Sequence, residues 1–327
     1  MMVNLSAVAS HARVSKATAS RVLSGRGLGL VAPETTQRVQ WAARELGYQT
    51  NPIASALTTG KTRVVALWMP NLYRPYYAMV MHELCMVAHA AHYELIVAHS
   101  GATNAPQWPV DGIIAHDLSA LPTQERTQNT PLVVIGEWPL LEVDSVRFDL
   151  VTATQTAVEH LIVQGCRQIA YIRQEEVVRH PTGRFTTYVE TLARHGQAPQ
   201  HIPVTEDTSQ AGYEAILRFM RDGGQVDGIF CHNDEIALGA AHALHELGRR
   251  LPEDVKLVGC DDLESSRFIV PPLSSIRIPI REVAQTAWAF LEARIQAPDI
   301  PRQHVTLPAV LIPRLSSLYP NQQELNL

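Results

Sequence analysis

The spacing of apolar and polar positions divides the chain into a short helical head and a longer body. In the head, apolar side chains recur every three or four residues, as they do in amphipathic helices. This pattern predicts three helices, at residues 5–11, 15–23 and 33–46. From residue 64 onward, short apolar runs typical of buried strands alternate with helix-like segments. Such alternation predicts parallel sheets covered by helices.

The head has the start and stop signals of three closely packed helices. Asn4 and Ser15 are typical N-cap residues, and Pro33 is favoured in the first turn of a helix. Small alanines at positions 9 and 12 permit a close crossing of the first two helices, which a tight turn separates. The head is therefore predicted to form a helix-turn-helix.

The body contains an internal repeat. VDGIIAH at 110–116 recurs as VDGIFCH at 226–232, with five identities in seven positions at a separation of 116 residues. Each copy belongs to a series of four strand-like runs; the runs are 64–69, 94–98, 112–115 and 132–135, then 169–172, 201–204, 228–231 and 256–259. We expect two parallel-sheet halves with a ligand cleft between them, at the carboxyl ends of the strands.

The two halves differ in one connection. The second half has room for a helix at 210–221, between the strands that end at Val204 and begin after Val226. The corresponding segment of the first half, between His99 and Val110, is half as long and contains two prolines. We therefore expect the first half to lack one covering helix.

Charge distribution favours a polyanionic partner for the head. Residues 1–61 carry seven Lys or Arg and two Asp or Glu, which is 7 − 2 = +5, so the remainder of this chain of net charge −5 carries −5 − 5 = −10. A basic head on an acidic body is expected when one end meets nucleic acid. A chance fluctuation of charge in a window of this size is the alternative.

The second helix of the head offers a contact surface without acidic residues. In a helix-turn-helix this helix lies in the major groove, where early residues meet base edges and their neighbours meet phosphates. A three-helix bundle with a solvated polar face is the alternative. The candidate DNA-binding residues that this geometry predicts are Asn4, Ser15, Lys16, Ala17, Thr18, Ser20 and Arg21, with Arg26 in the loop that follows.

The head resembles a known family over about sixty residues. VNLSAVASHARVSKATASRVLSG, followed by VAPETTQRVQWAARELGYQTNPIASAL, is similar to the lac repressor/galactose repressor family of bacterial transcription regulators. The resemblance implies a hinge helix at residues 52–57 that folds on operator DNA, with Leu57 as a wedge in the minor groove. It also implies a type I, periplasmic-binding-protein-like body. The chain departs from the family at Arg13, where a turn glycine is usual, so Arg13 either tolerates strain in the turn or makes an extra phosphate contact.

Polar side chains after the strands are candidates for the effector site. Arg74, Tyr76 and Tyr77 follow the first strand of the first half. The resemblance implies that Tyr76, Tyr77, Arg184, Asn233 and Asp261 hold the effector, whereas Arg74 is a feature of this chain. Two arginines in the cleft would favour a sugar acid or sugar phosphate over a neutral sugar. Asp234 and Asp262 fit helix caps as well as ligands.

Other classes of protein fit the sequence less well. Adjacent Asp261 and Asp262 do not form an acid/base pair, and no motif of hydrolases or nucleotide-binding enzymes occurs, so we expect neither an enzyme nor a cofactor or metal site. The four cysteines have no metal spacing and are expected to be buried free thiols. The sequence shows neither an apolar run long enough for a membrane span nor a basic leader, which favours the cytoplasm.

Taken with the resemblance, these patterns predict a ligand-responsive transcription regulator, a repressor, that binds a palindromic operator as a homodimer. A periplasmic-type sugar-binding protein and a constitutive DNA-binding protein are the alternatives. The C-terminal segment 314–327 has no leucine heptad, so dimers are expected rather than tetramers. The expected domains are a helix-turn-helix head at 1–49, a hinge and linker at 50–62, and an effector-binding body at 63–327, with subdomains at 63–147 plus 279–308 and at 148–278 plus 309–327.

Overall fold

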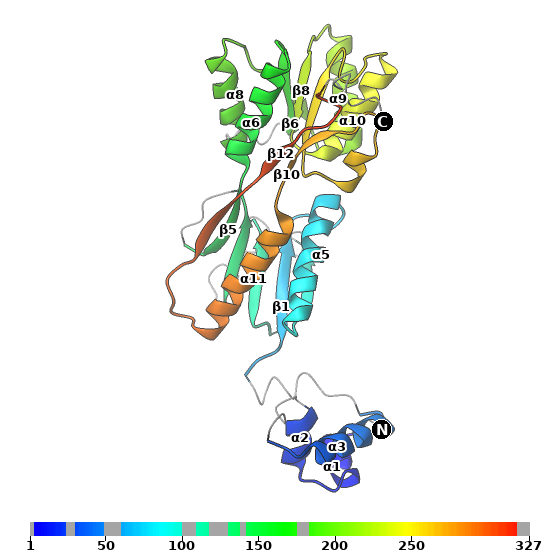
Figure 1. Ribbon diagram of the computed structural model, residues 1–327, viewed down its shortest axis with the longest axis vertical. Helices are drawn as coiled ribbons and strands as arrows, with labels where there is room; N and C mark the ends of the chain where they lie inside the picture. The colour runs from blue at the N-terminus through cyan, green and yellow to red at the C-terminus, as the bar shows by residue number, and fades with distance from the viewer. Residues whose placement is uncertain are drawn as a thin grey trace, which may run out of the picture. The chain divides into compact units, whose positions relative to one another are not determined.

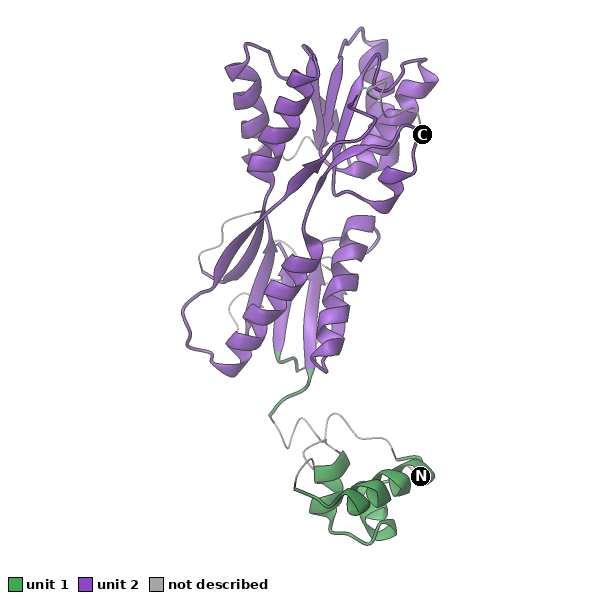
Figure 2. Ribbon diagram, in the orientation of Figure 1, with its two compact units in different colours: residues 1–63, 109–111 green, residues 64–108, 112–327 purple. Residues whose placement is uncertain are grey.

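The computed structural model divides the chain into two units (Figure 2). The first unit comprises residues 1–63 and 109–111, and the second comprises residues 64–108 and 112–327. The residues that the structure describes are 3–23, 30–48, 60–99, 109–117, 130–137, 142–174 and 183–318. The predicted hinge helix with Leu57, the candidate Arg26, and most of the shortened connection before Val110 lie outside the described residues.

The first unit contains the three predicted helices. They are α1 (Leu5–His11), α2 (Lys16–Leu23) and α3 (Pro33–Glu45). The Asn4 carboxamide caps α1 by accepting a hydrogen bond from the Ala7 amide at 2.9 Å, and Ser15 caps α2 by accepting one from the Thr18 amide at 3.0 Å. Ala9 and Ala12 are buried at the crossing of α1 and α2. The helix-turn-helix prediction is confirmed.

The second unit consists of two six-stranded sheets with the same strand order (Figure 1). The first sheet has the order β11-β5-β4-β3-β1-β2 and the second β12-β10-β9-β8-β6-β7. All described pairings are parallel except that of β10 with β12, which is antiparallel. The strands are β1 (Val64–Met69), β2 (Glu94–His99), β3 (Gly112–His116), β4 (Leu132–Gly136), β5 (Asp144–Asp149), β6 (Ile169–Gln174), β7 (Gln200–Val204), β8 (Gly228–Cys231), β9 (Lys256–Cys260), β10 (Ser274–Arg277), β11 (His304–Pro308) and β12 (Val310–Ile312).

Each sheet forms a lobe with the helices that pack on it. The first lobe contains the first sheet with α5 (Pro75–Ala90) and α11 (Ile280–Gln296), which contact each other. The second lobe contains the second sheet with α6 (Leu150–Val163), α8 (Gly183–Arg194), α9 (Ser209–Arg221), α10 (Asp234–Glu246) and the short 3-10 helix Glu264–Arg267. The two copies of the repeated heptapeptide contain β3 and β8, which occupy equivalent places in the two sheets. The predicted pair of parallel-sheet halves is confirmed.

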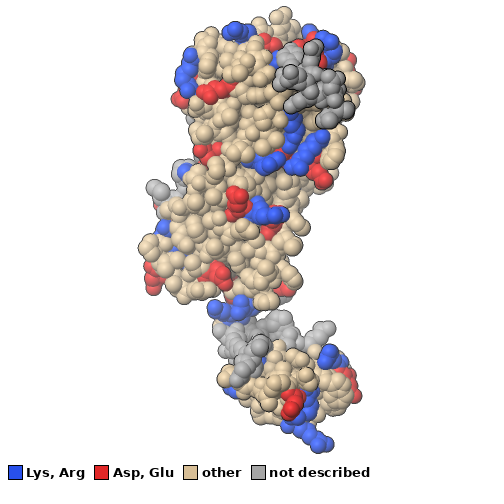
Figure 3. Space-filling model, in the orientation of Figure 1, with Lys and Arg blue, Asp and Glu red and all other residues tan. Residues whose placement is uncertain are grey.

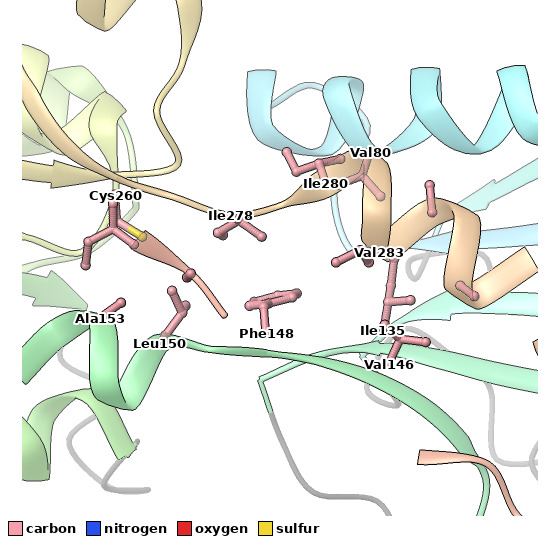
Figure 4. Packing of buried hydrophobic residues seen from close by; sticks show 14 of the residues in the cluster. Val80, Ile135, Val146, Phe148, Leu150, Ala153, Cys260, Ile278, Ile280 and Val283 are labelled. Atoms are coloured by element: carbon pink, nitrogen blue, oxygen red, sulfur yellow. The ribbon is translucent and has the colours of Figure 1, made fainter. Parts of the chain in front are cut away.

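The lobes share one apolar core where the chain passes between them. β5 of the first lobe leads directly into α6 of the second, and β10 leads back into α11. Phe148, Leu150, Ile278 and Cys260 belong to a single cluster of buried residues that extends into both lobes. Figure 4 shows Phe148 and Ile278 between residues of the second lobe and residues of the first. The lobes are therefore packed against each other along their crossover segments.

One expectation about the cysteines is wrong. Cys166, Cys231 and Cys260 are buried free thiols, as predicted, but Cys85 is exposed. Cys85 lies on α5, where the residues that face the sheet are Val80, Leu84 and Ala88. Position 85 is one residue beyond this buried stripe, so the helical period turns its side chain outward.

Candidate functional site

The candidate DNA-contact residues lie together on the head. Lys16, Ala17, Ser20 and Arg21 are exposed on α2, and Thr18 is half-buried beside the Ser15 hydroxyl, 2.8 Å away. No acidic residue occurs in α2. Its exposed face can therefore approach phosphates and base edges without repulsion from carboxylates.

The turn before α2 contains the unusual residue Arg13. It adopts φ 51°, the left-handed conformation that glycine takes most easily, and its side chain is exposed. Left-handed backbone at this position ends α1, because the Arg13 and Val14 amides turn back to the Ser10 and Ala9 carbonyls at 3.1 and 3.0 Å. The sequence left open whether Arg13 accommodates strain, and the structure shows that it does.

The predicted effector residues of the body come together between the two lobes. Tyr76 and Tyr77 lie in the first turn of α5 in the first lobe, with ring centroids 5.2 Å apart. The Tyr76 hydroxyl hydrogen-bonds Nε2 of His116, at the end of β3, at 3.0 Å. Asp207 and Asp261 of the second lobe are close enough to raise the pKa of Tyr77, which burial and these carboxylates bring to about 12. We call these residues, together with the ion pair described next, the inter-lobe cluster; it consists of Tyr76, Tyr77, His116, Asp207, Asp261, Glu137, Arg184 and His232.

An ion pair joins the two lobes within this cluster. Arg184, on α8 of the second lobe, donates to both carboxylate oxygens of Glu137, which follows β4 of the first lobe, at 3.1 and 2.6 Å. The Arg184 guanidinium also reaches the His232 carbonyl at 3.0 Å and His232 Nε2 at 2.9 Å. The Arg184 side chain is 6% exposed, so this pair is shielded from water. Arg184 is therefore neutralised by Glu137, which was not among the predicted site residues.

Arg74 makes the second connection between the lobes. Its guanidinium donates to the Asp207 carbonyl and lies 3.8 Å from the Glu235 carboxylate at the start of α10. The Asn233 side chain donates to the same carbonyl at 3.3 Å, while its oxygen caps α10 through the Ile236 amide at 2.8 Å. Arg74 points between the lobes as expected, but its charge already faces an acid, which removes the reason to expect an anionic ligand at Arg74.

Asp234 and Asp262 serve the structure of the second lobe. The Asp234 carboxylate accepts hydrogen bonds from the Ser275 and Ser266 hydroxyls at 2.6 and 2.7 Å and from the Leu263 amide at 2.8 Å. Burial raises the pKa of Asp234 to about 6, against the effect of these bonds. Asp262 is paired with three guanidinium groups, those of Arg314, Arg277 and Arg267. Both carboxylates are thus engaged by partners within the second lobe, and the cap of α10 is Asn233.

Several polar groups of the inter-lobe cluster have unused hydrogen-bonding capacity. The Asp261 carboxyl and the Tyr77 hydroxyl make no hydrogen bond among the residues described, and both residues are only partly buried. Nδ1 of His116 and Oδ1 of Asp207 are buried without a hydrogen-bond partner. Burial raises the pKa of Asp261 well above its ordinary value, with Asp234 adding to the effect. A buried donor or acceptor that is left unpaired is costly, so this cluster is suited to a ligand with several hydroxyl groups.

The two histidines of the repeat are neutral at physiological pH. Burial lowers the pKa of His116 to about 4, and burial together with Arg184, Arg173 and Arg74 lowers that of His232 well below its ordinary value. They occupy equivalent positions, as the repeat predicted, and each meets a tyrosine, since Tyr171 hydrogen-bonds His232 at 3.2 Å. Among the described residues no group of three or more His, Cys, Asp or Glu could hold a metal ion.

Four residues of this cluster were not among the predicted site residues: His116, Glu137, Asp207 and His232. Each follows or ends a strand, and that position was the only signal in the sequence.

The described part of the chain has no helix long and apolar enough to cross a membrane. On the visible face of the body, most of the surface is uncharged, and the basic and acidic side chains form small separate groups (Figure 3).

Comparisons with known proteins assign both parts of the chain. Residues 4–51 match the family model "Bacterial regulatory proteins, lacI family", and residues 158–317 match "Periplasmic binding protein-like domain". The ribose operon repressor of Halalkalibacterium halodurans is 28% identical over 324 residues, which cover 96% of each chain.

Solved structures support the same fold. The lac repressor dimer bound to operator and the anti-inducer ONPF superposes with a TM-score of 0.83 at 23% identity, covering 98% of this chain and 100% of that one. A LacI family regulator from Arthrobacter sp. FB24 in complex with lactose has a TM-score of 0.68 at 27% identity, covering 78% of this chain and 99% of that one. The fold is therefore a helix-turn-helix head followed by a type I periplasmic-binding-protein-like body.

Proposed function

Because the chain belongs to the lacI family of bacterial regulatory proteins, we propose that it is a transcription repressor whose affinity for a palindromic operator is switched by a carbohydrate-like effector. The observation that carries the proposal is the inter-lobe cluster, in which unpaired polar groups of both lobes meet. The named relatives are regulators, and one solved relative contains lactose. A ligand that bonds to both lobes would favour one arrangement of them, which is how binding is coupled to a change in the body.

The proposal assigns a role to each part of the chain. Residues 1–49 read the operator through the exposed face of α2, residues 50–62 form the hinge, with Leu57 as the minor-groove wedge, and residues 63–327 bind the effector and dimerise. The subdomains of the body are 63–147 with 279–308, and 148–278 with 309–327. The effector residues are Tyr76, Tyr77, Arg184, Asn233 and Asp261, with Arg74 beside them. Such a repressor acts in the cytoplasm, where its operator lies.

A homodimer would place two heads on a two-fold operator. One face of α5 supports this assembly, because it is exposed and contains no Lys, Arg, Asp or Glu; it consists of Ala78, His82, Cys85, Met86 and His89. Leu72 and Tyr73, which precede α5, are 42% and 97% exposed. Exposed apolar surface of this kind is typical of an interface. Sedimentation of the purified chain with Met86→Glu tests the interface, and a variant that remains dimeric would exclude this face.

The head is tested with an operator selected from random DNA. Arg21→Ala should abolish specific retention without changing the melting of the body, whereas Arg194→Ala, on exposed α8 surface, should leave retention unchanged. Specific binding retained by Arg21→Ala would contradict the assignment of α2.

The body is tested by thermal shift of the full chain against sugars, sugar acids, sugar phosphates and nucleobases. If none of these compounds stabilises the chain or alters operator affinity, the ligand-responsive function is wrong.

A further inference from the structure

Arg173 is a buried cation whose guanidinium forms no hydrogen bond. It lies near the carboxyl end of β6 in the second lobe and has an exposed fraction of 0%. None of its three guanidinium nitrogens has a hydrogen-bond partner. A guanidinium carries five N–H donors, and buried arginines are normally paired with acids or hydrogen-bonded to carbonyls.

The contacts of Arg173 are aromatic. Its guanidinium carbon lies 3.7 Å from the ring centroid of Phe185, in the first turn of α8, and 5.9 Å from that of Tyr171. A ring face attracts a cation, but it cannot accept the in-plane N–H groups of the guanidinium. The aromatic contacts therefore fix the plane of the group and leave its edge without an acceptor.

Arg173 adjoins the inter-lobe cluster. Ile172 pairs with Cys231 across β6 and β8, so Arg173 stands at the level of His232, the next residue along the neighbouring chain. Tyr171 joins the two, since its ring lies under Arg173 and its hydroxyl hydrogen-bonds His232 at 3.2 Å. His232 in turn contacts Arg184 at 2.9 Å. Arg173 is thus connected through Tyr171 and His232 to Arg184, which the proposed function assigns to the effector.

The charges around Arg173 do not compensate it. The neighbouring Arg184, whose charge lowers the pKa of Arg173, is already paired with both carboxylate oxygens of Glu137. Arg74 likewise faces Glu235 and the Asp207 carbonyl. Of the three arginines in this region, Arg173 alone has no acid or carbonyl partner among the described residues. A positive charge in such surroundings is stabilised by an anion that supplies in-plane oxygens.

We propose that Arg173 receives an anionic group of the effector, a carboxylate or a phosphate, while the remaining groups of the inter-lobe cluster bind its hydroxyls. This inference rests on the proposed function of the body and names the class of its ligand: sugar acids or sugar phosphates. When the anion binds, the long side chain of Arg173 turns so that its guanidinium leaves the Phe185 ring and faces the inter-lobe cluster. The anion-binding charge is then supplied by Arg173, and Arg74 serves to connect the lobes.

The ligand class is tested with matched pairs of compounds on the full chain. Calorimetry compares glucose with gluconate and with glucose 6-phosphate, and ribose with ribose 5-phosphate; inorganic phosphate and sulfate are separate arms. We expect the anionic member of at least one pair to bind about tenfold or more tightly than the neutral sugar. The gluconate and phosphate arms distinguish the two kinds of anion. If neutral sugars bind and change operator affinity but no anionic partner binds better, the inference is wrong and the proposed function stands. If no compound binds, both fail.

Variants of Arg173 give a second readout that needs no known ligand. Arg173→Met should raise the Tm of the chain alone by a few degrees, because it removes an unpaired buried charge and keeps the apolar volume. It should also abolish the preference for the anion and leave affinity for the neutral sugar within about twofold. Arg173→Lys should keep part of the preference. Arg194→Met, at an exposed position of α8, is the matched control and should change neither quantity.

Two results would overturn the inference through these variants. A lower Tm of Arg173→Met would mean that Arg173 has a stabilising partner within the chain. The sequence offers Glu175 and Glu176 two and three residues later, so the double variant Glu175→Gln/Glu176→Gln is combined with Arg173→Met. Non-additive Tm changes would identify these glutamates as the partner and exclude the anion, whereas additive changes are expected. An anion preference that survives Arg173→Met would equally contradict the role of Arg173.

Discussion

At the scale of single residues, Arg13 shows a local conflict between side chain and backbone. Its left-handed φ of 51° disfavours any residue with a Cβ. Arg13→Gly should therefore stabilise the head by about 0.5–1 kcal/mol, seen as slower hydrogen exchange of the Val8 and Val39 amides. Arg13→Lys, which keeps both the strain and the charge, should leave exchange unchanged. Equal exchange rates in the glycine variant would show that the turn is not strained.

The same variant settles the role that the sequence left open for the Arg13 charge. If Arg13 contacts a phosphate, Arg13→Gly lowers affinity for all DNA sequences alike and reduces the salt dependence of binding by about one phosphate contact. Because the side chain is exposed beside α2, we expect this uniform loss. It would be measured by fluorescence anisotropy over a range of salt concentrations, with Arg13→Lys as the control that retains binding.

His116 predicts a dependence of stability on pH. Burial lowers its pKa from 6.5 to about 4, so between these values the unfolded chain binds a proton that the folded chain does not. The free energy of unfolding is therefore not reduced by His116 above pH 6.5. It falls as the pH falls from 6.5 toward 4, by at most roughly 3 kcal/mol. His116→Gln, which keeps a hydrogen-bonding group for Tyr76, should flatten the pH profile of urea unfolding in this window.

The pH profile of unfolding of His116→Gln must be compared with that of the parent chain, because Asp234 changes stability with pH in the opposite direction. Its pKa is raised to about 6, so the folded state holds a proton that the unfolded state has lost, and stability from Asp234 grows as the pH falls through that value. The difference between the two profiles isolates His116. Parallel profiles of parent and variant would mean that His116 is protonated equally in both states.

Site residues could be predicted from the sequence only where position along a strand was enough. Tyr76, Tyr77 and Asp261 follow strands and meet between the lobes, as expected. The partner of Arg184 could not be predicted, because Glu137 lies 47 residues earlier and only the packing of the lobes brings the two together. Arg173 was missed for a related reason, since a cation within a strand gives no sign in the sequence that it is buried and unpaired.

At the scale of elements, the strands that the sequence predicted are those with continuous apolar runs. β1 and β8 have the predicted bounds, and the other six predicted strands differ by one or two residues at their ends. β5 was not predicted, because its sequence DSVRFD appears polar. In the fold, its buried Asp144 is paired with Arg294 of α11 at 2.8 Å and its Ser145 hydrogen-bonds His304 at 2.9 Å. Partners from distant parts of the chain thus make a polar strand compatible with an interior position in a sheet.

Close packing of α9 on α10 depends on two glycines. A Cβ at Gly239 would lie 1.8 Å from the Ser209 carbonyl oxygen, and one at Gly212 would lie 2.3 Å from that of Ile236. In an exposed helix, glycine to alanine stabilises by about 1 kcal/mol, but here the helices would have to separate. Gly239→Ala should therefore destabilise the chain by about 2 kcal/mol, measured by urea unfolding.

The matched control for this pair of helices is Gly183→Ala at the start of α8. There the nearest atom to the added Cβ, at 2.8 Å, is the end of the Val151 side chain, which is 48% exposed and can move. We expect Gly183→Ala to change stability by less than about 1 kcal/mol. A stabilising effect of Gly239→Ala would show that α9 and α10 are not in this close contact.

At the scale of the whole molecule, two ion pairs of opposite polarity connect the lobes. In one the arginine belongs to the second lobe (Arg184 with Glu137), and in the other to the first (Arg74 with Glu235). Glu137 acts on the pKa of Tyr76 and Arg74 on that of Tyr77, so both pairs adjoin the groups that we assign to the effector. A ligand that enters between the lobes must be compatible with both connections, so the arrangement of the lobes and the occupancy of the site are linked.

The two connections are expected to differ in strength, and this difference can be measured. Glu137→Gln removes the acid from a bidentate pair whose arginine is 6% exposed, so a buried charge loses its partner. We expect a loss of about 2 kcal/mol of stability and, in small-angle scattering, a larger radius of gyration as the lobes separate. Glu235→Gln acts on a looser contact of 3.8 Å and leaves Arg74 its bond to the Asp207 carbonyl, so its effect should stay below about 0.5 kcal/mol with an unchanged radius. Equal effects of the two variants would mean that the Arg184 pair does not hold the lobes together.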